Sequence, residues 1–125
     1  MSTLDPPASP IALTTQLIAQ LQQLQADAGA PKIAERSLQP QVTALQHLYQ
    51  QQLLPALIAS PAASTLTTYQ TEINRALRLL GMDVTFLRSA KTPQTQAKRL
   101  AQLQDRLRIL LEFSQGLQAE LGGGE

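Results

Sequence analysis

The sequence contains no cysteine and no tryptophan, and aromatic residues make up only 3% of its 125 residues. Without cysteine the chain forms no disulfide and no thiolate metal site, which fits a reducing compartment. No apolar run approaches the roughly 18 residues of a membrane span. The N-terminal MSTLDPPASP has neither the basic region nor the hydrophobic core of a signal peptide. We therefore expect a cytoplasmic protein that does not associate with membranes.

Leucine, alanine and glutamine dominate the sequence, and they recur at helical spacing. This composition, poor in β-branched residues, favours helices over strands. A chain of 125 residues corresponds to one domain. We expect an all-α, antiparallel four-helix bundle-like domain over residues 9–121, because short connections favour antiparallel neighbours. Residues 1–8 are expected to form a flexible lead and residues 122–125 a flexible tail.

The segment 65–90 organises the predicted bundle as its third helix, because its apolar residues nearly encircle a helix. A polar strip through Thr71, Arg75, Arg78 and Thr85 separates two apolar stripes. The first stripe is Leu66, Tyr69, Ile73, Leu77, Leu80, Val84 and Leu87, and the second is Leu79, Met82, Phe86 and Ala90. A helix with two apolar stripes is usually central and contacts neighbours on more than one side.

Capping signals delimit the first helix and the start of the third. Ser9 is an N-cap followed by a proline at the first helical position, and Gly29 marks the end of the helix. Either Ser60 or Ser64 can cap the third helix. The apolar face of the first helix is Leu13, Leu17, Leu21, Leu24 and Ala28.

The second helix is expected over residues 37–59. Pro40 lies either in its first turn or at a kink in a helix that begins near Lys32. Pro55 should bend the last turn, because it removes the hydrogen bond to the carbonyl of Gln51. The apolar face of this helix is Leu38, Val42, Leu45, Tyr49, Leu53 and Leu57.

The fourth helix begins after the cap-and-proline pair Thr92-Pro93. Ile109 and Phe113 add a second contact strip to its heptad pattern. The heptad positions are Leu100, Leu103, Leu107, Leu110, Ser114, Leu117 and Leu121.

Two residues of the third helix break local rules. Gly81 lies in the middle of the helix, where glycine costs about 1 kcal/mol relative to alanine. It indicates either the close approach of another helix's backbone or a notch in which a partner docks. Asp83 lies among apolar residues one turn away on either side, so its carboxylate needs a partner to offset its desolvation. We expect a structural ion pair with an arginine, or a hydrogen bond from a hydroxyl, of a neighbouring helix.

Basic residues are concentrated in one half of the chain. Between Arg75 and Arg108 there are eight basic and two acidic residues, whereas the remainder carries two basic and seven acidic ones. The two predicted helices in this region therefore form a cationic hairpin that can attract an acidic partner. Arginine suits this role because it binds carboxylates in a bidentate manner. The predicted partner-binding residues are Arg75, Arg78, Arg88, Lys91, Lys98 and Arg99.

The sequence offers little that could carry catalysis. His47 is the only histidine, and its one-turn neighbours are those of a solvated face. Glu72 and Asp83 are eleven residues apart on one helix, about 16 Å, which is too far for paired acid and base work. The chain has no Walker loop and no glycine-rich loop after a strand. We predict no catalytic, cofactor or metal site, and we do not expect an enzyme.

Two other functions compete with binding of an acidic protein. The cationic hairpin could bind nucleic acid, but it lacks interleaved exposed aromatic residues, and a pI near 8.2 is low for such a binder. The heptad of the fourth helix could instead continue as an intermolecular coiled coil in a scaffold protein. A homodimer through one of the two-sided helices is compatible with either role.

Residues 69–99, YQTEINRALRLLGMDVTFLRSAKTPQTQAKR, resemble PatD, the heterocyst frequency control protein family of cyanobacteria, and the segment QQQLLP at 50–55 is similar too. The resemblance implies a small cytoplasmic regulator that binds the tubulin-like division protein FtsZ at the division site. It also implies an effect on heterocyst frequency in filamentous organisms. Because FtsZ surfaces are generally acidic, the cationic hairpin is the expected contact.

Overall fold

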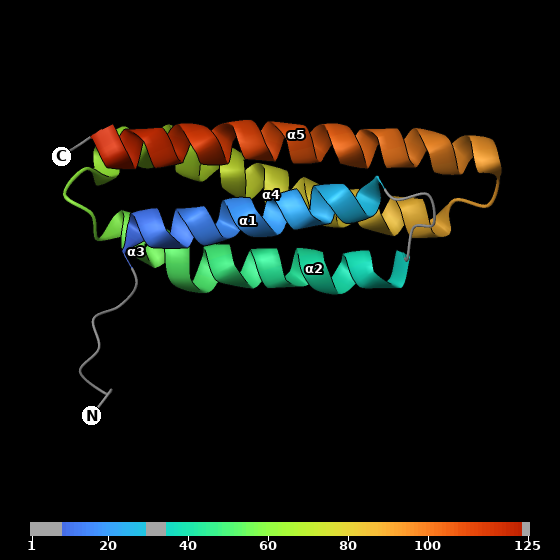
Figure 1. The fold of residues 1–125 in the computed structure, drawn as a ribbon, viewed down its shortest axis with the longest axis horizontal. Helices are drawn as coiled ribbons and strands as arrows, with labels where there is room; N and C mark the ends of the chain where they lie inside the picture. Colours follow the sequence, from blue (N-terminus) through green and yellow to red (C-terminus); the bar gives the residue numbers. More distant parts are fainter. Residues whose placement is uncertain (1–8, 30–34, 124–125) are drawn as a thin grey trace, which may run out of the picture.

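The computed structural model describes residues 9–29 and 35–123 (Figure 1). The prediction of an all-helical chain is confirmed, because these residues contain helices and turns and no strand. The predicted flexible lead, residues 1–8, lies outside the described residues. The elements are α1 (Pro10–Ala28), α2 (Glu35–Leu48), a π-helical turn (Tyr49–Leu53), α3 (Leu54–Ile58), a 3-10 turn (Ala63–Leu66), α4 (Thr67–Ser89) and α5 (Pro93–Gly123).

The long helices α1, α2, α4 and α5 lie side by side around one hydrophobic core (Figure 1). Helix α4 packs along α5 and α2, and α1 packs along the same two helices. Each long helix therefore has two principal neighbours and turns its apolar stripe toward the middle. Helix α4 is two-sided, as predicted, but it occupies no more central a position than α1.

The two apolar stripes of α4 have different environments. The first stripe lies in the core, where Ile73, Leu80 and Val84 are fully buried. The second stripe does not: Met82 is 47% and Phe86 42% exposed. The expectation of a nearly encircled helix is therefore wrong, because a ring of four helices covers only the inward half of each member. Met82 and Phe86 face outward from the bundle.

Two of the predicted helix starts are confirmed. The Ser9 hydroxyl accepts a hydrogen bond from the backbone N–H of Ala12 at 3.2 Å, at the N-terminus of α1. The Thr92 hydroxyl likewise accepts from the N–H of Thr95 at 3.1 Å, and α5 begins at Pro93. Each arrangement satisfies a backbone donor that the first helical turn leaves free.

The predicted serine cap of α4 is wrong. The 3-10 turn leads directly into α4, whose N-terminus at Thr67 has no side-chain cap. The Ser60 hydroxyl accepts instead from the N–H of Ala62 at 3.2 Å, inside the connection. The tighter turn replaces the cap because its own hydrogen bonds satisfy part of the helix terminus.

The second predicted helix is divided at a π-helical turn. Helix α2 begins at Glu35, so Pro40 lies inside it rather than in the first turn. The N–H of Leu54 donates to the carbonyl of Tyr49, five residues earlier, immediately before Pro55. Proline cannot donate to the carbonyl four residues before it, and the wider turn is the local adjustment to that loss. The predicted disturbance at Pro55 therefore takes the form of a π-turn.

Helix α5 places its heptad in the core of its own chain. Leu103, Leu107, Leu110 and Leu117 are fully buried, and α5 packs against both α4 and α1. This stripe is therefore not a free coiled-coil seam. The helix continues to Gly123, so the predicted tail from residue 122 is wrong for its first two residues, and residues 124–125 lie outside the described part.

Candidate protein-interaction surface

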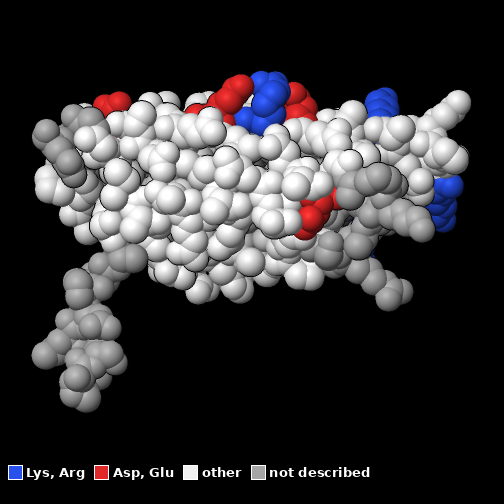
Figure 2. Space-filling view, in the orientation of Figure 1, with Lys and Arg blue, Asp and Glu red and all other residues white. Residues whose placement is uncertain are grey.

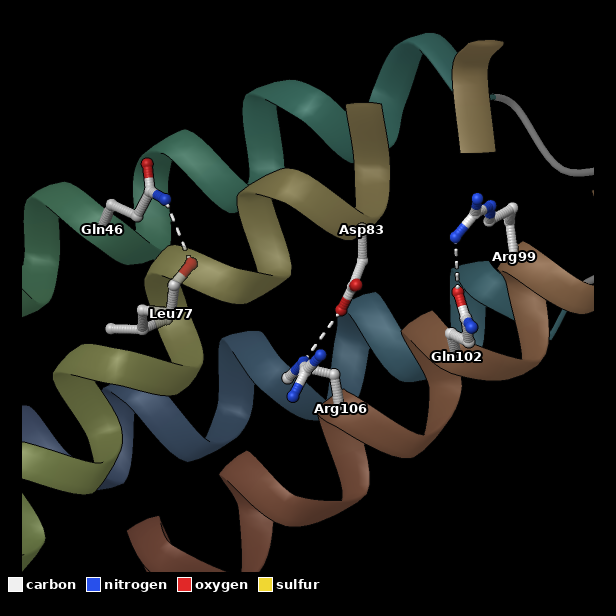
Figure 3. Close-up of polar contacts among 6 residues, drawn as sticks. All are labelled: Gln46, Leu77, Asp83, Arg99, Gln102 and Arg106. Atoms are coloured by element: carbon white, nitrogen blue, oxygen red, sulfur yellow. Dashed lines mark hydrogen bonds and ion pairs between the residues drawn. The ribbon is translucent and has the colours of Figure 1, made fainter. Parts of the chain in front are cut away.

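Asp83 and Arg106 join the two helices of the cationic hairpin. The Arg106 Nε donates to Asp83 Oδ2 at 2.9 Å, from α5 to α4 (Figure 3). The side chain of Asp83 is 8% exposed and that of Arg106 29%. The predicted structural ion pair is thus confirmed, with Arg106 as the partner that the sequence did not single out.

Arg108 is also paired, within α5. It donates to Asp105 at 2.7 Å and to Glu112 at 2.9 Å. The hydrogen bond to Asp105, together with the charges of both carboxylates, raises the pKa of Arg108 above its ordinary value. Asp83 and Asp105, the two acidic residues between Arg75 and Arg108, are therefore paired with Arg106 and Arg108.

The positive charges of the six predicted partner-binding residues are not neutralised by ion pairs among the described residues. Within the part of the chain that the structure describes, none of them lies within ion-pair distance of a carboxylate. Five are exposed, and Arg99 is half-buried. Those five are Arg75, Arg78, Arg88, Lys91 and Lys98. Their positive charge is therefore turned toward solvent.

The structure distributes these six residues over more than one face. Arg75 and Arg78 lie one turn apart on the outward face of α4. Arg88 comes thirteen residues after Arg75, which turns it about 140° around the helix and moves it about 20 Å along the axis. Lys91 lies in the connection to α5, and Lys98 and Arg99 follow in α5 itself. Arg88, Lys91, Lys98 and Arg99 lie near the α4–α5 connection, whereas Arg75 and Arg78 lie about 15–20 Å back along α4. The six cations therefore do not form one patch.

The space-filling view agrees with this distribution (Figure 2). Basic side chains appear at the right-hand end, where α4 connects to α5 in Figure 1, and a mixed basic and acidic group follows the upper edge over α5. The face in view, which α1 and α2 form, is almost free of charge. Charged side chains are therefore concentrated at one end and one edge of the molecule in this view, and the face between them carries a single acidic patch.

Phe86 and Met82 are the residues of this surface that sequence reasoning missed. The guanidinium of Arg99 lies over the Phe86 ring, 4.9 Å from its centroid, and Arg99 also donates to Gln102 at 3.1 Å (Figure 3). Phe86 is thus a single exposed aromatic residue of the hairpin, which the sequence periodicity had placed in an apolar stripe. The available signal was the spacing of Met82 and Phe86, which are four residues apart and therefore share the helix face of Arg75.

Two hollows flank the outward face of α4. One, of about 370 Å³, is lined by α4 alone. The other, of about 220 Å³, lies between α4 and α5. The first is lined by Arg78, Gly81, Met82, Thr85 and Phe86. The second is lined by Glu72, Arg75, Ala76, Leu79, Arg106, Ile109 and Phe113. Arginine and apolar side chains thus alternate along the same strip of surface.

Gly81 combines the two interpretations that the sequence left open. A Cβ at this position would lie 3.1 Å from Nε2 of Gln46 on α2, which donates to the Leu77 carbonyl at 3.2 Å (Figure 3). The close approach is therefore real, although a side chain and not a backbone makes it. Gly81 also lines the 370 Å³ hollow, so it forms the notch as well.

The described residues hold no group of three His, Asp or Glu side chains placed to bind a metal ion. His47 is exposed on α2.

Across residues 9–29 and 35–123, no helix combines the length and the hydrophobicity that a membrane crossing requires.

The chain was compared with known families, curated proteins and solved structures. Residues 60–114 match the CRR41 C-terminal domain, which is 55 of the 125 residues. The matched part runs from the connection before α4 to the last third of α5, so it contains all six predicted partner-binding residues. Nothing in the match links the chain to PatD specifically. No curated protein and no solved structure matches the chain.

Proposed function

We propose that this protein is a non-enzymatic regulator that binds FtsZ and modulates its assembly. The observation that carries the proposal is the uncompensated positive charge along α4 and around the α4–α5 connection. Arg106 and Arg108 are neutralised within the hairpin, whereas Arg75, Arg78, Arg88, Lys91 and Lys98 reach solvent without a carboxylate at ion-pair distance among the described residues. Such a surface favours an acidic partner and speeds its association.

The choice of FtsZ rests on the resemblance of residues 69–99 to PatD, and these residues form α4, the connection and the start of α5. The segment that carries the resemblance is therefore the segment that carries the charge. In filamentous cyanobacteria the same interaction would connect cell division to heterocyst frequency. A fluorescent fusion that stays diffuse in dividing cells would argue against a role at the division site.

We further propose that the binding unit is an antiparallel four-helix bundle. In Figure 1 the sequence colours run from left to right along α1 and α4 and from right to left along α2 and α5, which supports this arrangement. The Asp83–Arg106 pair then holds α4 and α5 in register. A rigid hairpin presents its cations with little loss of conformational entropy on binding.

Co-sedimentation with FtsZ polymers tests the proposal. Arg75→Glu/Arg78→Glu should weaken binding at least about tenfold, since both residues then repel an acidic surface. Arg108→Glu is the control, because Arg108 is engaged with Asp105 and Glu112 on the outer side of α5. Circular dichroism should show equal helicity for all variants. Binding by the double variant that equals the wild type would exclude this face.

Dependence on ionic strength gives a second readout. Raising the salt concentration from about 0.05 M to 0.3 M shortens the screening length from about 14 Å to 6 Å. The association rate should fall several-fold, while the dissociation rate changes less. An association rate that does not respond to salt would contradict charge-driven capture.

A further inference from the structure

We propose that the outward face of α4 is a docking site for an acidic amphipathic helix, whose apolar side chains insert against Met82 and Phe86. The inference rests on the proposed function in one respect, that the partner is an acidic protein. It goes further in naming the partner's contacting element and the residues that anchor it. Neither anchor belongs to the cationic set that the sequence predicts.

The apolar part of the site is an outward pair one helical turn apart. Among the described residues, the large hydrophobic side chains that remain exposed are Ile11, Ile58, Met82 and Phe86. Ile11 and Ile58 lie on α1 and α3, whereas Met82 and Phe86 share one face of α4 and line the same hollow of about 370 Å³. Large exposed apolar groups framed by polar residues are typical of interaction sites, and methionine adapts its shape to a partner.

Guanidinium groups lie on both sides of this pair. On one side, Arg78 lines the hollow of about 370 Å³, and Arg75 lies one helical turn before Arg78 on α4. On the other side Arg99 lies over the Phe86 ring at 4.9 Å, so it fixes the ring and adds positive charge. The complement of such a surface is a pair of apolar side chains with carboxylates before and after them. Charge complementarity therefore identifies the occupant as acidic as well as apolar.

The geometry favours a helix as that occupant. From Arg75 to Phe86 the face extends about 16 Å along the axis of α4, at a rise of 1.5 Å per residue. A second helix lying along it repeats the same spacing, with apolar residues at i and i+4 and acidic residues one to two turns away. Addition of an extended strand needs an open sheet edge, and the described residues contain no strand.

Met82 makes a direct test possible. It is the one methionine among the described residues, so ¹³C-methyl labelling places a signal in the site. The probe is a synthetic helical peptide of about 18 residues, or about 27 Å, with two leucines four positions apart and glutamates on either side of them. One control peptide has the same residues in scrambled order, and another has lysine in place of glutamate.

The expected result is a dose-dependent shift of the Met82 methyl signal with the acidic amphipathic peptide alone. Phe86→Ser should weaken binding at least about tenfold, as expected for an anchor residue. Ile58→Ser is the matched control, because it removes an exposed apolar side chain on α3 and should bind like the wild type. Met82→Gln, followed by calorimetry, repeats the test with a second anchor.

Four outcomes would overturn the inference. Three are equal binding of the scrambled peptide, equal binding of the lysine peptide, and wild-type affinity in Phe86→Ser and Met82→Gln. An equal shift of the Met82 signal by a single-stranded oligonucleotide would do the same, because the surface would then bind polyanions in general.

Co-sedimentation separates this inference from the proposed function. If Phe86→Ser binds FtsZ normally while Arg75→Glu/Arg78→Glu does not, the docking site is wrong and the proposed function stands. If the acidic peptide binds at Met82 while the wild-type protein does not sediment with FtsZ, the docking site stands and the choice of FtsZ is wrong.

Discussion

The ion pair between Asp83 and Arg106 predicts an asymmetry in stability that can be measured. The perturbations are Arg106→Met, Asp83→Leu and the double variant, each of which replaces a charged side chain by an apolar one of similar size. Asp83 has a short side chain that is 8% exposed, whereas the side chain of Arg106 is 29% exposed. Arg106→Met therefore leaves a buried carboxylate without a partner, whereas Asp83→Leu leaves a partly exposed guanidinium without one.

Arg106→Met should be the costlier single change. It leaves the Asp83 carboxylate buried without its partner, and breaking a buried pair in this way costs about 3 kcal/mol. Asp83→Leu should cost only about 1 kcal/mol, because the longer Arg106 side chain can turn its guanidinium to water. The guanidinium of Arg106 can also turn toward Glu72, because both residues line the hollow of about 220 Å³ between α4 and α5. The double variant should return to within about 1 kcal/mol of the wild type, since no charge is then left buried.

Urea denaturation followed by circular dichroism measures all four proteins. With a slope of about 1.5 kcal/mol per M, the midpoint of Arg106→Met should fall by about 2 M and that of Asp83→Leu by less than 1 M. The double-mutant cycle then gives the coupling between the two sites. Equal losses in the two single variants, or a double variant that loses their sum, would refute the assignment of the cost to a stranded carboxylate.

Three further predictions concern the core. Ser114→Ala should stabilise the protein by about 1 kcal/mol in urea denaturation, because the fully buried Ser114 hydroxyl has no hydrogen-bond partner among the described residues. Burial raises the pKa of Tyr49 from 10.0 to about 12, so the protein should lose up to roughly 3 kcal/mol of stability as the pH rises through this interval. Tyr49→Phe should lack this loss, and an equal loss in the variant would assign it to other groups. Gly116→Ala should destabilise the protein by about 1 kcal/mol although alanine has the better helix propensity, because the new Cβ would lie 2.9 Å from the Tyr69 ring. Gly81→Ala should be neutral or stabilising, because the new Cβ would meet only the movable end of the Gln46 side chain. Equal melting temperatures of the two variants would contradict the packing at Tyr69.

Helical periodicity predicted most of the core of this protein. The stripe from Leu66 to Leu87, apart from the partly buried Tyr69, and the heptad from Leu103 to Leu117 are buried in the structure, because a period of 3.6 residues fixes which side chains share a face. The caps at Ser9 and Thr92 were equally local, so the residues alone indicated them. The same locality explains why Asp83 could be assigned an ion pair.

Features that depend on neighbouring helices could not be predicted in this way. The exposure of Met82 and Phe86 depends on how many helices surround α4, and a two-stripe pattern does not specify that number. The 3-10 start of α4 in place of a serine cap depends on how the preceding connection closes. The choice of Arg106 as the partner of Asp83 depends on the relative register of α4 and α5, which no pattern within one helix contains.

The same limit applies to the candidate site. The sequence identified the excess of positive charge between Arg75 and Arg108, since that is a matter of counting. It treated Arg75 and Arg88 as one cluster because they are near in sequence, whereas thirteen residues of helix turn them about 140° apart. The apolar half of the surface was missed because Met82 and Phe86 were assigned to the core.

The order in which the helices pack has a consequence for folding kinetics. The contacts of α1 with α2, of α2 with α4, and of α4 with α5 join helices that are successive long elements of the chain, and only the packing of α1 on α5 joins distant segments. Most native contacts can therefore form while little loop entropy is lost, and chains of low contact order fold within microseconds to milliseconds. The hydrogen bond that Gln118 donates to Thr15, at 2.8 Å, belongs to the one long-helix contact whose formation must close a loop of nearly the whole domain.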